Sequence, residues 1–129
     1  MPDAYVSGAA ALARRGDATS QLKVAQMYHA GRGISQNLVE AAKWYRRAAD
    51  QGIPQAQQNL GIAHAMGYGL RQDFVEAYKW LNLACGSYTS DRYRSLAAKA
   101  RDLVVTRMTA SDIAEAQRLS REWVVQREN

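Results

Sequence analysis

The sequence contains very little cysteine, proline or phenylalanine. Cys85 is the one cysteine, which excludes an internal disulfide and favours a reducing compartment. Only two prolines interrupt 129 residues, so the composition permits long helices. No apolar run approaches the roughly 20 residues that span a membrane, and residues 1–15 lack the basic and apolar segments of a secretion signal. The sequence therefore predicts a single domain in the cytoplasm, with no membrane contact.

The sequence also lacks any long block of charge of one sign. Its net charge of +5 comes from 17 basic and 12 acidic residues, and the basic residues occur singly or in pairs such as Arg14-Arg15 and Arg46-Arg47. A track for nucleic acid requires basic residues gathered on one face. The scattered pattern is more typical of a solvated surface, and nucleic-acid binding is kept as an alternative on the basis of the pI of 9.6.

What the sequence does contain is a repeat. The segments Gly31–Trp44 and Gly67–Trp80 align without a gap at a constant offset of 36 residues. The identical pairs are Gly31/Gly67, Gly33/Gly69, Gln36/Gln72, Val39/Val75, Glu40/Glu76, Ala41/Ala77, Lys43/Lys79 and Trp44/Trp80. A fixed period of this size is typical of stacked supersecondary units.

Each copy is predicted to be a hairpin of two helices. Ala41, Trp44 and Ala48 recur at i, i+3 and i+7, which places them on one stripe of a helix, and the second copy repeats the spacing. Asn37 and Asp73 precede a glutamate by three residues and are predicted to cap this helix. Gly52 and Gly86 are predicted to end it. The G-x-G sequence lies between the two helices of each hairpin.

The two copies resemble the Sel-like repeat, a branch of the tetratricopeptide-like α-solenoids, in its bacterial type. Ser20–Gly52 meets the family pattern almost in full, and Ala56–Gly86 meets it again. The resemblance implies an all-α, right-handed solenoid of about seven helices. Its expected units are an N-terminal half repeat (1–16), repeat 1 (17–52), repeat 2 (53–86) and C-terminal capping helices (87–129).

The ends of the chain fit the repeat less well. Gly8 stands 36 residues before Trp44, in the position of the tryptophan. Residues 91–106 and 110–126 are predicted to form two further helices, the second capped by Thr109. Terminal helices of this kind cover a core that otherwise faces water.

Residues with catalytic potential do not form a recognisable site. The short G-x-G sequences follow a helix and lack a P-loop lysine, so they are interpreted as turns and not as phosphate cradles. His29 and His64 lack the cysteine and carboxylate companions of a metal site. Cys85 aligns with Ala49 and is predicted to be a small buried residue. Neither an enzyme nor a cofactor is expected. Hydrolysis, linked to cysteine-rich relatives of this repeat, remains the weakest alternative because their paired cysteines are absent.

The resemblance instead predicts a binding surface. The first helix of each hairpin lines the concave side of such a ribbon, and its inward positions differ between the copies while the core residues repeat. These positions are Thr19, Lys23, Gln26, His29, Gln55, Asn59, Ile62 and Met66. The expected function is an adaptor or scaffold that binds a protein or peptide segment on this face. A ribbon of two repeats is short, which is also compatible with self-association.

Overall fold

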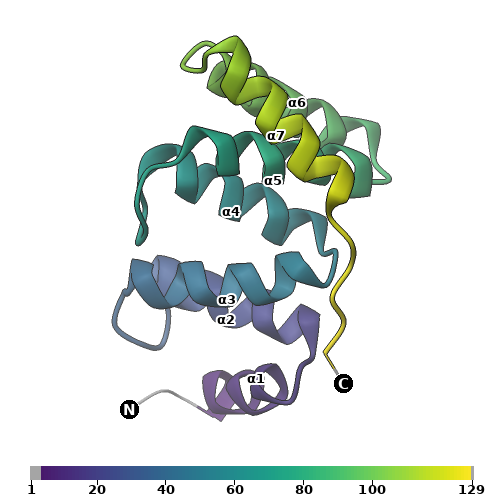
Figure 1. Ribbon diagram of the computed structural model, residues 1–129. Coiled ribbons are helices and arrows are strands. Elements are labelled where there is room, and N and C mark those ends of the chain that lie inside the picture. Colours follow the sequence, from purple (N-terminus) through teal and green to yellow (C-terminus); the bar gives the residue numbers. More distant parts are fainter. Residues whose placement is uncertain (1–3, 129) are drawn as a thin grey trace.

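The computed structural model describes residues 4–128, with side chains from residue 8 onward, and this part of the chain forms seven helices. From α1 to α6 each helix packs against the next in a stack, and α7 packs against α5 (Figure 1). Their bounds are α1 (Ala4–Arg14), α2 (Ala18–Ala30), α3 (Leu38–Asp50), α4 (Pro54–Met66), α5 (Phe74–Ser87), α6 (Asp91–Val105) and α7 (Ala110–Glu122). The described residues contain no strand, which confirms the all-α class.

Three helices, α3, α5 and α7, begin at the capping residues that the sequence predicts. Asn37 and Asp73 each accept a hydrogen bond at 3.1 Å from the backbone N–H three residues later, at the start of α3 and of α5. Thr109 and Asp112 form a reciprocal capping box at the start of α7. Each such cap satisfies a backbone donor that the helix itself leaves unpaired.

The G-x-G loops turn the chain between the two helices of each hairpin. Gly31 and Gly67 take the left-handed conformation that ends α2 and α4. Gly69 lies so close to α3 that a Cβ atom there would collide with the carbonyl of Leu38. The glycine of the second loop is therefore required for packing between repeats as well as for the turn.

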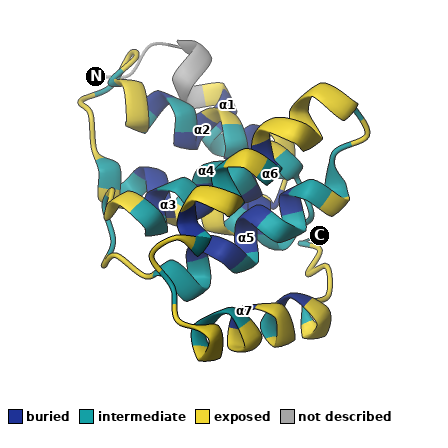
Figure 2. Ribbon diagram, turned by 90° about the horizontal axis from the view of Figure 1, so that it is seen from above, coloured by how far each residue is buried: buried dark blue, intermediate teal, exposed yellow. Residues whose placement is uncertain are grey.

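The tryptophan at the equivalent position of each repeat is more deeply buried in the middle of the stack than near its N-terminal unit. Trp80 is completely buried in a cluster formed by α2, α3, α4 and α5. Trp44, at the equivalent position one repeat earlier, is only half-buried and borders α1. Gly8 is exposed, and no described atom outside its own stretch of helix lies within 4 Å of the position that its Cβ would occupy. Figure 2 shows buried residues along α3 and α5, in contrast with the largely exposed turns of α7.

Two helix ends differ from the sequence prediction. Gly86 does not end α5, which continues to Ser87, because its backbone remains helical and Tyr88 still donates to the carbonyl of Ala84. The last helix ends at Glu122 instead of residue 126. The residues that follow include two adjacent valines, whose branched side chains disfavour a helix, and they run as an extended segment back along the stack (Figure 1).

Candidate functional site

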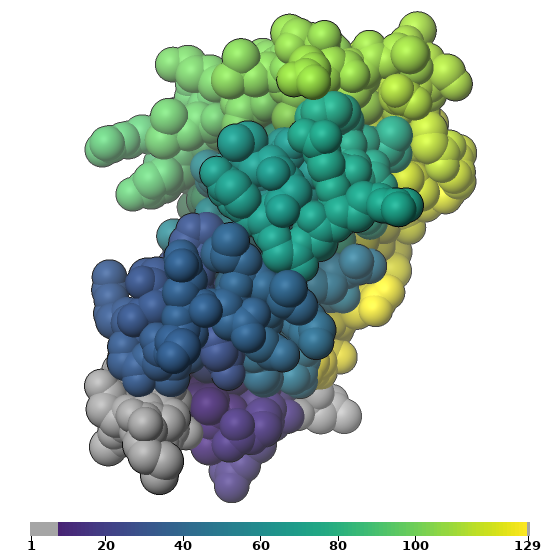
Figure 3. All heavy atoms as spheres, turned by 90° about the vertical axis from the view of Figure 1, so that its left-hand side faces the viewer, coloured from purple at the N-terminus to yellow at the C-terminus, as the bar shows by residue number. Residues whose placement is uncertain are grey.

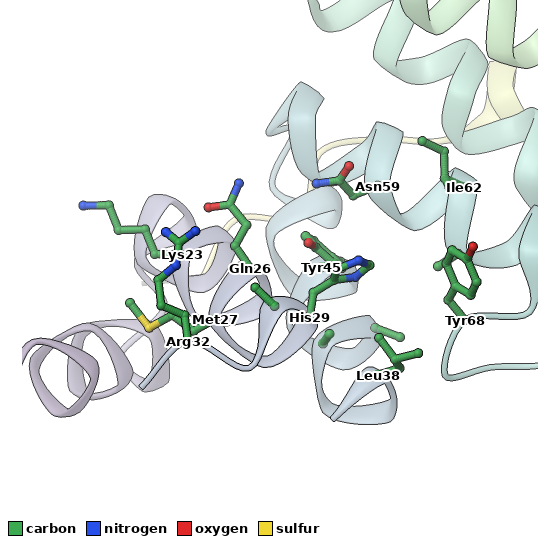
Figure 4. Close-up of a pocket in the computed structure, with 14 residues that line it drawn as sticks. Lys23, Gln26, Met27, His29, Arg32, Leu38, Tyr45, Asn59, Ile62 and Tyr68 are labelled. Carbon is green, nitrogen blue, oxygen red and sulfur yellow. The ribbon is translucent and has the colours of Figure 1, made fainter. Parts of the chain in front are cut away.

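A groove of about 620 Å³ opens between α2 and α4, with α3 as its floor. The lining residues of α2 and of α4 recur at helical spacing, so one face of α2 lies opposite one face of α4 across the groove (Figure 4). The loop after α2 contributes Arg32 and the loop after α4 contributes Tyr68. The lining residues are Lys23, Gln26, Met27, His29, Ala30, Arg32, Leu38, Ala41, Ala42, Tyr45, Asn59, Ile62, Ala63 and Tyr68.

Three rings form an aromatic centre in this groove. His29 lies edge-on to Tyr45, with ring centroids 6.3 Å apart, and edge-on to Tyr68 at the same separation. Tyr45 is 5% exposed, and its burial raises the pKa of the hydroxyl to about 12. The side chain of Asn59 lowers this pKa, but by less than burial raises it. Tyr45 therefore remains an uncharged phenol at any physiological pH. Edge-to-face pairs hold the rings in a defined arrangement.

Polar side chains surround the aromatic centre. Gln26 and Asn59 face the groove from α2 and α4, and each carries both donors and acceptors (Figure 4). Lys23 and Arg32 add two positive charges, and neither forms an ion pair with a carboxylate of the described residues. The groove thus offers hydrogen bonds to a backbone, positive charge to a carboxylate and an apolar surface to a side chain.

The structure brings five of the eight predicted surface residues to the groove. Lys23, Gln26 and His29 line it from α2, and Asn59 and Ile62 line it from α4. The other three lie near helix ends, outside the groove, where they are exposed: Thr19, Gln55 and Met66. A part for these three in binding stays a prediction.

Sequence reasoning missed the residues that the second helix and the loops contribute. Tyr45 lies on α3, the second helix of its hairpin, whereas the prediction named residues of the first helices alone, and Tyr68 lies in a turn. A signal for both was present in the alignment of the copies. Tyr45 corresponds to Leu81 and Tyr68 to Arg32, so both positions change where the neighbouring core residues are constant.

The remaining candidates for chemistry are separate from the groove. His64 packs as a half-buried ring, and burial lowers its pKa below the ordinary value. Cys85 is half-buried, less than the sequence predicts because α5 is near its end there, and burial raises the pKa of its thiol. A raised pKa leaves less of the reactive thiolate. Residues 4–128 contain no group of three or more histidine, cysteine or acidic side chains able to hold a metal, and no helix among them is long and apolar enough to cross a membrane.

Comparison with known proteins identifies the repeating unit. A model of the Sel1 repeat family matches residues 18–53 and, a second time, residues 54–86, which together make up slightly more than half of the chain. The chain belongs to the Sel1 repeat family. The two matches coincide with the hairpins α2–α3 and α4–α5. Sel1 repeats are generally protein-interaction modules, and their fold is typically a non-catalytic scaffold.

Two solved structures extend this finding to the fold. The first is a protective antigen present in uropathogenic Escherichia coli strains, which displays a Sel1-like repeat fold; it is 25% identical, with a TM-score of 0.85 over 95% of this chain. The second is a Sel1 repeat protein from Oxalobacter formigenes, which is 32% identical, with a TM-score of 0.63 over 64% of this chain. These matches confirm the α-solenoid. The chain spans 26% of the first protein and 63% of the second. A search of curated proteins found no match.

Proposed function

We propose that this Sel1 repeat protein is an adaptor that binds an extended segment of a protein partner in the groove between α2 and α4. The observation that carries the proposal is the convergence of Lys23, Gln26, His29, Asn59 and Ile62 on one cavity. These residues come from equivalent faces of two repeats, and they vary between the repeats, whereas several core positions are identical: Gln21/Gln57, Ala41/Ala77 and Ala48/Ala84. Variation on a constant scaffold is how repeat proteins acquire a specific ligand.

The chemistry of the groove favours a peptide that is both polar and apolar. The amides of Gln26 and Asn59 can pair with peptide N–H and C=O groups, as an extended backbone requires. Tyr68 and Ile62 present apolar surface to a side chain of the ligand. Lys23 and Arg32 lie at the same side of the groove (Figure 4) and favour a segment that carries an acidic residue there.

Ion pairing weighs against the nucleic-acid alternative. Seven of the 17 basic side chains pair with carboxylates of the described residues, most of them within a single helix. The charge of these seven side chains is thereby partly neutralised, which reduces what they can contribute to binding phosphates. Binding of nucleic acid would fall steeply with rising salt, whereas binding of a peptide in the groove falls less.

The experiment is a selection of displayed random peptides on the full chain, followed by affinity measurements with the selected peptides. A groove variant combines Lys23→Ala, Asn59→Ala and Ile62→Ala. We expect it to bind at least about tenfold more weakly, since each lost anchor removes on the order of 1 kcal/mol. The control is Lys43→Ala, which removes an exposed lysine on α3 outside the groove. Equal affinity for wild type and groove variant, with the helical content intact, would contradict the proposal.

A further inference from the structure

Residues 123–128, here called the strap, leave the end of α7 and run down one edge of the stack. They pass the turn between α3 and α4 and reach the level of α2 and the end of α1 (Figures 1 and 3). The strap has no regular secondary structure. It therefore lies on the folded repeats as a short extended peptide would.

The two ends of the strap make its strongest contacts. At its start, the ring of Trp123 packs edge-on against the buried Trp80, with ring centroids 6.1 Å apart. At its end, the carboxylate of Glu128 accepts two hydrogen bonds from the guanidinium of Arg47 and one, at 3.0 Å, from the amide of Gln21. Gln21 is completely buried, so the carboxylate meets a built site and not a loose surface cation.

The middle of the strap is held much less. The backbone N–H of Gln126 donates to the carbonyl of Asp50 at 2.7 Å, and Val125 lies against Gly52. Val124, Val125, Gln126 and Arg127 are all exposed. The occupant of this site is thus defined by an aromatic anchor and, five residues later, a carboxylate.

Only the first repeat offers the carboxylate site. One repeat later, Gln57 keeps the same bond to a preceding carbonyl that Gln21 makes, 3.2 Å to the carbonyl of Ala49. The position equivalent to Arg47 is Leu83, however, and the Oε1 atom of Gln57 is buried without a hydrogen-bond partner among the described residues. The cation is therefore a specific feature of the strap site and does not follow from the repeat pattern.

We propose that the strap site is a second peptide-binding site, separate from the groove, and that the strap of a second copy of this chain binds there in exchange for the chain's own. Every copy carries both the site and its ligand, so mutual exchange gives a closed dimer with twofold symmetry. Within one chain the strap has the advantage of a high effective concentration, so exchange requires a concentrated protein. The proposal does not depend on what the groove binds.

Reversal of the charges tests the exchange directly. In Arg47→Glu and in Glu128→Arg, each chain alone brings like charges together at the site. In an equimolar mixture, each strap finds an opposite charge only on the other chain. Sedimentation is expected to show monomers for each variant alone and a heterodimer for the mixture. The double variant Arg47→Glu with Glu128→Arg restores the pair within one chain and is the control. A mixture of folded chains that stays monomeric at the highest soluble concentration would overturn the proposal.

A peptide assay gives the same answer should either reversed-charge chain lose its helicity. The probe is a fluorescent synthetic peptide of residues 122–128, and the receptor is the full chain with Glu128→Gln, whose own strap is weakened. We expect the probe to bind this receptor at least about tenfold more tightly than it binds wild type. The receptor's own strap competes with the probe, and Glu128→Gln removes the charged hydrogen bonds that hold this strap in place. A probe with glutamine at its last position should lose that advantage. Absence of binding to the Glu128→Gln chain would refute the second site.

Discussion

Replacement of Trp80 by alanine tests the packing that holds the repeats together. The indole is completely buried, so the variant loses its full transfer free energy and leaves a cavity at the junction of four helices. A buried aromatic side chain removes about 150–250 Å² from water, which at about 25 cal/mol per Å² is roughly 4–6 kcal/mol as an upper bound. Measured costs for such changes are about 3–5 kcal/mol, and this is the destabilisation that we expect.

Trp44 supplies the matched comparison because the sequence places it at the same position of the previous repeat. It is half-buried and has the guanidinium of Arg47 over its ring at 4.7 Å. Trp44→Ala should therefore cost roughly half as much as Trp80→Ala. Urea unfolding at equilibrium, followed by circular dichroism, measures both. Equal costs for the two variants, or a cost below about 1 kcal/mol for Trp80→Ala, would refute the reasoning.

Three further predictions follow from local packing and charge. Gly61→Ala should destabilise the fold by about 1–3 kcal/mol, because its Cβ would lie 2.8 Å from Cγ of Leu81. Gly8→Ala has open space at its Cβ and should stabilise the fold by about 0.5–1 kcal/mol. Thermal unfolding of both variants checks these two values. Burial lowers the pKa of His64, so the unfolded chain binds the proton more readily than the folded chain does. The free energy of unfolding should therefore fall as the pH drops below about 6.5. Urea midpoints measured on either side of that pH should show this fall for the wild type and not for His64→Tyr. Amide hydrogens of α1 should exchange faster than those of α3, because a terminal unit has one neighbour and Gly8 provides no ring. Mass spectrometry follows the exchange, and equal protection of the two helices would show that α1 is as firmly packed as α3.

The hairpins could be predicted from the sequence because their determinants are local and occur twice. Asn37 and Asp73 cap the same helix in both copies, and the alanine and tryptophan stripe repeats with them. Burial was harder to predict. Trp44 and Trp80 occupy the same position of the repeat pattern, but they differ in burial because different helices surround them. The prediction at Gly86 was wrong because a glycine ends a helix only where the chain actually adopts a left-handed turn.

The candidate site could be predicted in part. Helical spacing on α2 and α4 identified five groove residues, because one face of a helix follows from periodicity. Tyr45 and Tyr68 depend on how α3 and a loop are placed, which no periodicity encodes. The strap was beyond sequence reasoning for the same reason: Glu128 pairs with Arg47 and Gln21, which lie 81 and 107 residues earlier in the chain, and the extended segment has no repeat.

The central claim is that a partner segment binds between α2 and α4, and chemical-shift mapping tests it most directly. A selected peptide is titrated into the isotopically labelled full chain, and the backbone amides that shift are assigned. The account predicts that the largest shifts cluster at Lys23, Gln26, His29, Asn59 and Ile62, with Tyr68 among them. Shifts confined to α6, α7 or the strap, with the groove unchanged at saturation, would contradict it.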